Sequence, residues 1–189
     1  MHLIIDTETT GLTPLSFVTE RNYKQWPRMI QIAWGLVGKD SIEIDHRALI
    51  RPDGFKIPYS AMRIHGITQQ QAEEEGEDLQ LQLKTLNNVM KDADSIVAHN
   101  LNFDLGIIQS EAMRIDFPLT FPEKRYCTAY MGQTYLRKEK KQRLANFPRL
   151  GELHKELLGF DYEPKHDALA DVIACAGVFE HLRRLGYAK

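Results

Sequence analysis

The chain has few of the features that mark secreted or membrane-embedded proteins. Its only two cysteines, Cys127 and Cys175, lie far apart without CxxC spacing, which supports neither a disulfide scaffold nor a cysteine-rich zinc site. No apolar run approaches the roughly 18 residues of a transmembrane helix. The amino terminus, MHLIIDTE, lacks the basic region and long apolar run of a signal peptide. We therefore expect a cytoplasmic protein with reduced thiols and no membrane partner.

The sequence also lacks a strong excess of charge of either sign. Lys and Arg number 24 and Asp and Glu 26, for a net charge of −2. This balance excludes a uniformly basic nucleic-acid coat, and taken alone it argues mildly against a nucleic-acid partner. The 189 residues are 43% hydrophobic and 26% charged, which is typical of a globular protein. The length predicts a single domain over residues 1–189.

The pattern along the chain predicts an α/β fold in which strands come first. Apolar runs at 2–5, 29–34 and 42–50 indicate strands, and the short turn signal Gly38–Asp40 between the last two implies antiparallel pairing. The remaining predicted elements are helix 79–93, strand 95–98, helix 101–115, a polar helix with a loop within 124–147, helix 150–158 ended by Gly159, and helix 167–185 followed by Gly186. This order predicts a mixed sheet with helices packed on it.

Local charge is less even than the total. Residues 73–78, EEEGED, hold five acidic side chains, whereas residues 124–149 hold eight Lys or Arg and one acid, Glu139. A solvated surface explains such runs in most proteins. The basic segment is equally suited to follow the phosphates of a polyanion, and both interpretations stay open at this point.

Four carboxylates fall at positions that suggest chemistry. Asp6 and Glu8 are two apart at the end of the first predicted strand, so both project to one face, where their repulsion is costly. A bound cation would remove that cost, and ligands that are all oxygen favour Mg²⁺ or Mn²⁺ over zinc. Asp104 and Asp171 each lie near the start of a predicted helix, where complementing the helix dipole is the alternative explanation.

Taken together, three motifs resemble those of a known family. DTETTGL at 6–12, HNLNFD at 99–104 and HDALAD at 166–171 resemble the three motifs of the DEDDh 3′-5′ exonucleases, the DnaQ-like group of the ribonuclease H-like superfamily. Residues 27–33 and 57–68, the latter ending in HGIT, also resemble the family. The resemblance covers nearly the whole chain in order. It implies a ribonuclease H-like α/β fold, with three antiparallel strands first, then parallel strands, and helices on both faces of the mixed sheet.

The resemblance also implies a role for each matched residue. Two Mg²⁺ or Mn²⁺ ions would be held by four catalytic carboxylates: Asp6, Glu8, Asp104 and Asp171. His166 would be the catalytic histidine, and an imidazole, which titrates near neutral pH, is suited to accept the proton of an attacking water. Four residues would bind the substrate near its 3′ end: Thr9, Leu12, His65 and Asn100.

Some neighbouring residues carry other expectations. We expect Asp167 to be the N-cap of the last helix rather than a ligand, and His99 to be a buried structural histidine rather than a catalytic one. Loop 13–28 could border the substrate groove. Many relatives have an Asp-Thr pair where this chain has Cys127-Thr128, so a supporting contact is in question there.

The expected function is metal-dependent 3′-5′ exonuclease activity. It would release nucleoside 5′-monophosphates from single-stranded or frayed 3′ ends, with DNA favoured over RNA, as in proofreading or DNA repair. The alternatives are an exoribonuclease of the same family that trims RNA 3′ ends and a non-catalytic nucleic-acid-binding module. Because the chain ends at Lys189, directly after the last predicted helix, no tail for a polymerase partner is expected, and a stand-alone nuclease is favoured.

Overall fold

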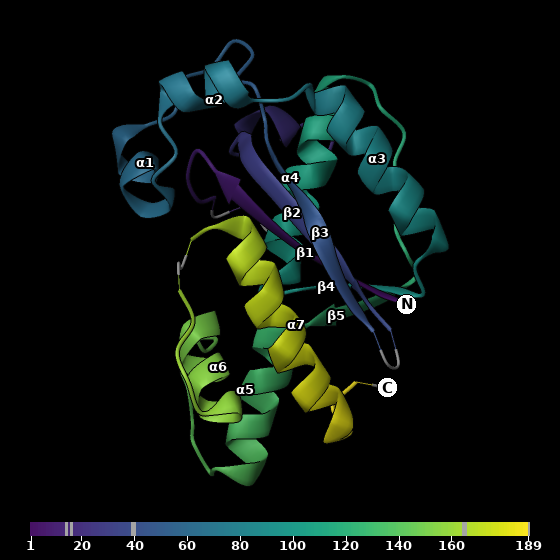
Figure 1. Ribbon diagram of the computed structural model, residues 1–189, viewed down its shortest axis with the longest axis vertical. Helices are drawn as coiled ribbons and strands as arrows, with labels where there is room; N and C mark the ends of the chain where they lie inside the picture. The colour runs from purple at the N-terminus through teal and green to yellow at the C-terminus, as the bar shows by residue number, and fades with distance from the viewer. Residues whose placement is uncertain (14, 16, 39–40, 164–165, 189) are drawn as a thin grey trace.

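The computed structural model describes residues 1–13, 15, 17–38, 41–163 and 166–188 (Figure 1). Within this part of the chain, five strands form one sheet in the order β3-β2-β1-β4-β5. They are β1 (His2–Thr9), β2 (Met29–Val37), β3 (Ile42–Leu49), β4 (Ser95–Ala98) and β5 (Lys124–Cys127). β1–β2 and β2–β3 pair antiparallel, whereas β1–β4 and β4–β5 pair parallel. The predicted mixed sheet is confirmed; residues 39–40 of the predicted turn lie outside the described residues.

Seven α-helices surround the sheet in the described part of the chain: α1 (Tyr59–His65), α2 (Gln69–Glu75), α3 (Leu79–Asp92), α4 (Leu101–Arg114), α5 (Thr128–Glu139), α6 (Leu150–Leu158) and α7 (Ala168–Arg184). A 3₁₀ turn, η1 (Tyr23–Gln25), lies between β1 and β2. The predicted ends at Gly159 and Gly186 are confirmed: both glycines adopt positive φ after a helix, the conformation that ends helices without a Cβ penalty.

The structure corrects the predicted elements in three places. β1 extends to Thr9, so Asp6 and Glu8 lie within the strand and not at its end. Residues 124–127 form an edge strand, whereas a helix with a loop was expected there. The strand was not recognised because its sequence, KRYC, carries the charge typical of an edge strand and little apolar pattern. Helices α1 and α2 were not predicted, since seven residues each are too few for a helical periodicity.

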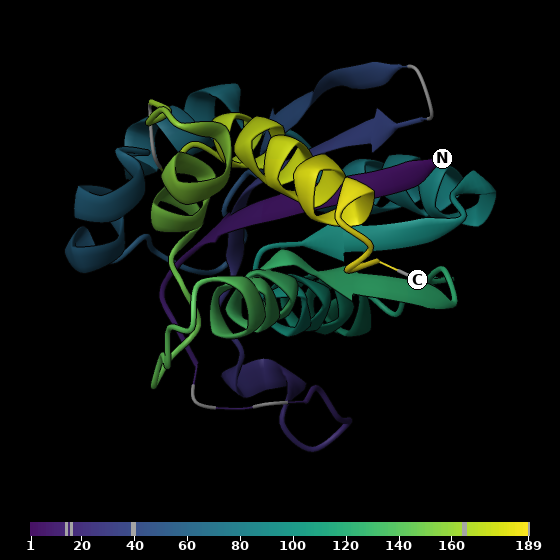
Figure 2. The same ribbon diagram turned by 90° about the horizontal axis from the view of Figure 1, so that it is seen from below.

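Side-chain alternation along β1 separates two apolar cores on opposite faces of the sheet. Leu3 and Ile5 join the core under α3 and α4, whereas Ile4 joins the core under α5, α6 and α7. Figure 2 shows α7 crossing one face of the sheet with α3 and α4 on the other. The expectation of helices on both faces is thus confirmed. None of the described helices is both long and apolar enough to cross a membrane.

The segment between β1 and β2 is held against α4 by a buried carboxylate and an arginine. Glu111 accepts hydrogen bonds from Arg28 Nε at 2.9 Å and from the Met29 backbone N–H at 2.8 Å. Arg114 donates to the carbonyl oxygens of Tyr23 and Trp26 at 2.9 and 2.7 Å. The Trp26 ring packs directly on Gly106 of α4. These contacts fix the chain that follows Asp6 and Glu8.

We expect Gly106→Ala to destabilise the protein by about 1–3 kcal/mol, the usual cost of overpacking a core. A Cβ at this position would lie 2.2 Å from two Trp26 ring carbons, and α4 or the loop must shift to accommodate it. Gly177→Ala in α7 is the matched control, because its Cβ would meet only Leu158 Cδ1, at 2.9 Å. That methyl can rotate away, and alanine improves helix propensity. Denaturant unfolding measures both variants; equal losses would contradict the tight Trp26 contact.

Candidate active site

The candidate site lies where the carboxyl-terminal half of β1 meets the amino-terminal turns of α4 and α7 (Figure 1). Asp6 and Glu8 continue the face of Ile4, which is covered by α7, whereas Thr7 continues the opposite face, covered by α4. The three motifs, which are far apart in sequence, therefore meet because one strand alternates its side chains between two helices.

Glu8 is buried and Asp6 partly buried, and both carboxylates repel their neighbours. Burial raises the pKa of Asp6 well above its usual range, and the charges of Asp104, Asp171 and Glu8 raise it further. Burial likewise raises the pKa of Glu8 to about 8, with Asp171 and Asp104 adding to the effect. Without a cation, this site therefore favours protonated carboxyl groups at neutral pH.

Asp104 reaches the site from α4. Its side chain is 3% exposed and accepts a hydrogen bond from Thr7 Oγ1 at 2.8 Å. Burial raises the pKa of Asp104 to about 7, although the bond from Thr7 favours the ionised form and opposes the shift. Asp104 is thus more than a charge that complements the helix dipole, because it is buried against the other carboxylates.

Asp171 lies in the first turn of α7 and is held by Tyr162. The Tyr162 hydroxyl donates to Asp171 Oδ1 at 2.7 Å. Burial raises the pKa of Asp171, while the bond from Tyr162 and the charge of His166 oppose that rise. The pKa of the Tyr162 phenol is raised by its own burial and by Asp171, so it remains a donor. The sequence analysis missed Tyr162, which lies in a loop outside the recognised motifs.

His166 stands on a turn immediately before α7. Its φ is 61°, an uncommon left-handed conformation for a residue other than glycine, and its side chain is exposed. Ligand atoms of Glu8, His166 and Asp171 all lie within 4.8 Å of one another. The next residue, Asp167, caps α7 by accepting from the Ala170 N–H at 3.1 Å, as predicted. The cap thereby fixes the start of the helix next to the histidine.

The four predicted substrate-binding residues differ in their surroundings. Thr9 is buried, and its Oγ1 donates to the Gly11 carbonyl at 2.7 Å, which shapes the loop before Leu12. Leu12 itself is 89% exposed. Asn100 is exposed at the N-cap of α4 with a left-handed backbone, φ 74°. The exposed side chains of Leu12 and Asn100 can therefore contact a ligand, whereas Thr9 holds the loop that carries Leu12.

His65 is the last residue of α1, and its ring lies within range of the charge of His166. Its Nδ1 accepts from the Ile67 N–H at 3.0 Å, and its buried Nε2 has no hydrogen-bond partner in the described ranges. Burial, followed by the charge of His166, lowers the pKa of His65. His65 also lines a cavity of about 370 Å³ that Arg47 and Asp167 border. An unsatisfied ring nitrogen beside a cavity is available for a ligand's hydrogen bond.

His99 has the structural role expected of it. Its ring nitrogens lie 3.0 Å from Thr128 Oγ1 and 2.9 Å from the Pro148 carbonyl oxygen, and burial lowers its pKa. The buried Thr128 hydroxyl also approaches the Ala98 carbonyl at 3.3 Å. The threonine of the Cys127-Thr128 pair therefore supplies a supporting contact at the end of β4.

The residues present fit divalent cations. Carboxylate oxygens from three elements converge, burial leaves them poorly solvated, and the repulsion among them raises their pKa values. A hard cation satisfies such oxygen donors and reverses the repulsion. The four carboxylates that would hold the ions are Asp6, Glu8, Asp104 and Asp171. Of these, Glu8 and Asp171 place ligand atoms within 4.8 Å of a ring nitrogen of His166.

We expect the metal-free protein to lose stability as pH rises from 6.5 to 8.5. Folding raises the pKa of Glu8 to about 8 and that of Asp104 to about 7, whereas carboxyl groups of an unfolded chain titrate near pH 4. The folded state thus binds more protons, and its advantage, complete at low pH, disappears as pH passes these raised values. His65 and His99, whose pKa values are lowered, titrate below this window.

Melting temperatures in EDTA and in Mn²⁺ at both pH values measure this effect. Mn²⁺ should raise the melting temperature more at pH 8.5 than at 6.5, because the ion competes with bound protons. A metal-free protein that melts higher at pH 8.5 would contradict the raised carboxyl pKa values.

Comparison with protein families gives one match over most of the chain. The model of the RNase_T family, described as Exonuclease, matches residues 3–179. Among the curated proteins, none matches the sequence. The family match spans all three motifs and therefore all four carboxylates of the site.

Solved structures share the fold at low sequence identity. Exonuclease X in complex with 5′ overhanging duplex DNA is 21% identical with a TM-score of 0.62, and the match covers 100% of this chain and 95% of that one. E. coli Exonuclease I in complex with a dT13 oligonucleotide is 20% identical with a TM-score of 0.75, covering 98% of this chain and 42% of that one. Its zinc-bound complex with single-stranded DNA has a TM-score of 0.76 at 20% identity, covering 97% and 40%. The chain therefore spans about two fifths of Exonuclease I, and the ribonuclease H-like fold is confirmed.

Proposed function

The chain belongs to the exonuclease family, and from its site we propose that it hydrolyses the 3′-terminal phosphodiester of single-stranded or frayed DNA, releasing nucleoside 5′-monophosphates. One observation carries the proposal: four carboxylates, two buried and two partly buried, and a histidine converge in the carboxyl-terminal half of β1. A structural cluster would not accumulate uncompensated acids, because their burial and repulsion destabilise the fold. The cluster makes sense as a site for cations that bind a phosphodiester.

Each side chain has a part in this proposal. Two Mg²⁺ or Mn²⁺ ions would be held by Asp6, Glu8, Asp104 and Asp171. They would lower the pKa of the attacking water and stabilise the negative charge on the leaving oxygen. His166, on its exposed turn beside Glu8 and Asp171, accepts the proton of the attacking water. Tyr162 orients Asp171 through its hydroxyl. The orientation of one carboxylate is thus fixed before substrate arrives.

The surroundings of the site support a terminal nucleotide as ligand. Leu12 offers an exposed apolar surface to a base, and the free Nε2 of His65 lies beside the cavity next to Asp167. Arg47, on the same cavity wall, is ion-paired with Asp167 at 3.0 Å. DNA is favoured because structures with this fold bind DNA: Exonuclease X with overhanging duplex, and Exonuclease I with single strands.

The test is a side-by-side digest with Mg²⁺ or Mn²⁺. Substrates are 5′-labelled single-stranded DNA, duplex DNA with matched or mismatched 3′ ends, and RNA of the same sequence. We expect a ladder that shortens from the 3′ end, nucleoside 5′-monophosphate as product, and faster loss from single strands and mismatched ends. A 3′-phosphate should slow the reaction, and EDTA should abolish it. Faster digestion of RNA would establish the exoribonuclease instead, and full activity in EDTA would overturn the mechanism.

A further inference from the structure

A basic, partly aromatic surface lies on α5 and the segment that follows it. We call it the basic ridge and define it by Tyr130, Arg137, Arg143, Phe147 and Arg149. Residues 141–147 are all exposed, and within the ridge Tyr130 is 62% and Phe147 49% exposed. Large aromatic rings between arginines on a surface are unusual for a merely solvated helix face.

The ridge is a built surface rather than a free loop. Tyr130, Gln133 and Arg137 share one face of α5 by helical spacing. The Gln133 side chain donates to the Asn146 carbonyl at 3.3 Å, which holds the segment after α5 against that face. The two parts of the ridge are therefore adjacent.

One end of the ridge is anchored beside the candidate active site. Pro148 is buried, and its carbonyl oxygen accepts a hydrogen bond from His99 Nε2 at 2.9 Å. His99 directly precedes Asn100, the N-cap of the helix that carries Asp104. Phe147 and Arg149 flank this anchor, so they start the ridge at the edge of the site.

The arginines of the ridge are available, whereas the neighbouring Lys140 and Lys141 are engaged. Lys140 pairs with Glu156 at 2.8 Å, and Lys141 Nζ donates to the Lys138 carbonyl at 3.0 Å. Arg137, Arg143 and Arg149 form no ion pair with any residue that the structure describes. A guanidinium offers paired donors that match a phosphate group.

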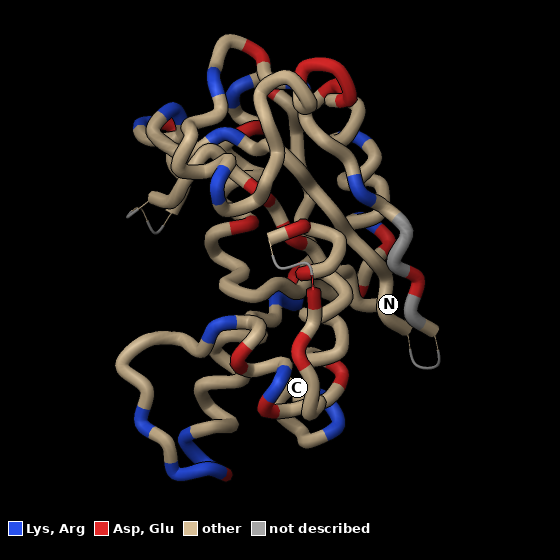
Figure 3. Tube along the Cα trace, turned by 60° about the vertical axis from the view of Figure 1, so that its left-hand side comes forward, with Lys and Arg blue, Asp and Glu red and all other residues tan. Residues whose placement is uncertain are grey.

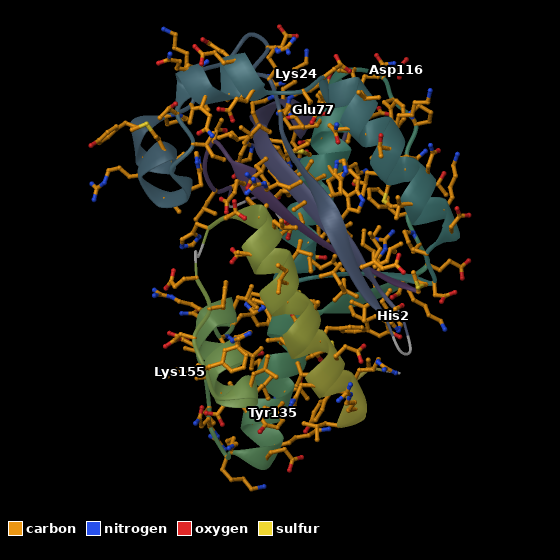
Figure 4. The ribbon with its side chains drawn as sticks, in the orientation of Figure 1. His2, Lys24, Glu77, Asp116, Tyr135 and Lys155 are labelled. Atoms are coloured by element: carbon orange, nitrogen blue, oxygen red, sulfur yellow. The ribbon has the colours of Figure 1, made fainter. Side chains whose placement is uncertain are left out.

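The opposite end of the molecule is acidic. The acidic run 73–78 covers the end of α2 and the residues before α3, and its five acidic side chains are exposed. Figure 4 places Glu77 there, with Tyr135 of α5 at the other end. In Figure 3 the acidic run is the red arc at the top and the basic segment the blue-marked loop at the lower left. A polyanion held at the site is repelled by one end and attracted by the other.

We infer that the single strand upstream of the bound 3′ end runs along the basic ridge. Its phosphates contact Arg149, Arg143 and Arg137 in turn, and its bases stack on Phe147 and Tyr130, the combination that grips single strands without reading sequence. This inference rests on the proposed function, because it takes the 3′ end to lie among the carboxylates. On this inference the basic segment 124–149 binds the substrate and is more than a solvated surface.

The test compares Arg143→Gln/Arg149→Gln with Lys84→Gln/Lys91→Gln, which removes the same charge from exposed positions of α3. On a 20-nucleotide thymidylate strand, the ridge variant should lose about tenfold in kcat/KM near 0.1 M salt and should reduce the slope of log(kcat/KM) against log[salt] by about 1.4, because each contact with a single strand contributes about 0.7. On a trinucleotide, which ends before the ridge, it should stay within twofold. The control pair should stay within twofold on both.

A third variant separates stacking from charge. Phe147→Ala should weaken binding of the 20-nucleotide strand without changing the salt slope, because it removes a stacking surface and no charge. Equal losses on both substrate lengths, or an equal loss in the control pair, would overturn the inference.

Binding measured by fluorescence anisotropy in Ca²⁺ keeps the two proposals apart. If the wild-type protein hydrolyses neither strand, the proposed function fails. The ridge is still supported if the arginine variant binds the labelled 20-nucleotide strand about tenfold more weakly, and it is overturned if binding is unchanged.

Discussion

Asp6→Asn is expected to abolish divalent-dependent hydrolysis and, at the same time, to raise the melting temperature of the metal-free protein. Asp6 lies at the centre of the acidic cluster, and burial and four neighbouring carboxylates raise its pKa. Asparagine has nearly the same shape but carries no charge. The substitution removes a proposed cation ligand and a source of repulsion in one step, so function and stability should change in opposite directions.

The loss of activity should be at least about 10³-fold, which corresponds to roughly 4 kcal/mol of activation free energy. A central ligand positions both the attacking and the leaving oxygen in two-cation catalysis, so its loss should affect kcat more than KM. Steady-state digestion of a labelled oligonucleotide in Mg²⁺ or Mn²⁺ measures this. The same assay on Asp116→Asn, an exposed site with a backbone that suits asparagine, should show wild-type activity.

The gain in stability should be visible in EDTA. For a protein of this size, each kcal/mol of repulsion removed raises the melting temperature by about 2–4 °C. Addition of Mn²⁺ should reverse the order of the two proteins, because only the wild type keeps its full ligand set. A lower melting temperature for Asp6→Asn in EDTA would show that Asp6 is a stabilising structural acid, and retained activity would remove it from the site.

The sequence predicted the parts of the fold that show periodicity. Strand β2 and helices α3, α4 and α7 each carry an apolar pattern that only one structure satisfies. The edge strand Lys124–Cys127 has no such pattern, because its place depends on β4, to which it pairs in parallel. Its structure is a property of the sheet, which local sequence does not encode.

The candidate site was likewise predicted where local motifs exist and missed where a residue's role depends on a tertiary contact. Asp6, Glu8, Asp104 and Asp171 were found through motifs, and the alternation along β1 explains why they converge. Tyr162 was missed because its role depends on a contact between a loop residue and Asp171 of α7, nine positions further along the chain. No spacing rule predicts that a tyrosine in such a loop will turn back onto a helix.

His166→Asn should lower kcat by about 10²–10⁴-fold, the usual contribution of a positioned general base, while leaving the fold and the binding of substrate in place. The exposed side chain makes no core contact, and asparagine tolerates the left-handed backbone found at this residue. Asparagine cannot accept a proton near neutral pH. The variant thus removes the proton acceptor and keeps the backbone conformation of the turn.

Two measurements separate this role from a structural one. The melting temperature should be unchanged, and oligonucleotide affinity in Ca²⁺ should remain within about threefold because His166 lies at the rim of the carboxylates. Asp167→Asn is the matched control, since asparagine also caps a helix, and it should keep kcat within a few-fold. If His166→Asn keeps its kcat, the water's proton goes to another acceptor, and Glu8, whose carboxylate lies in the same cluster, is the next candidate to test.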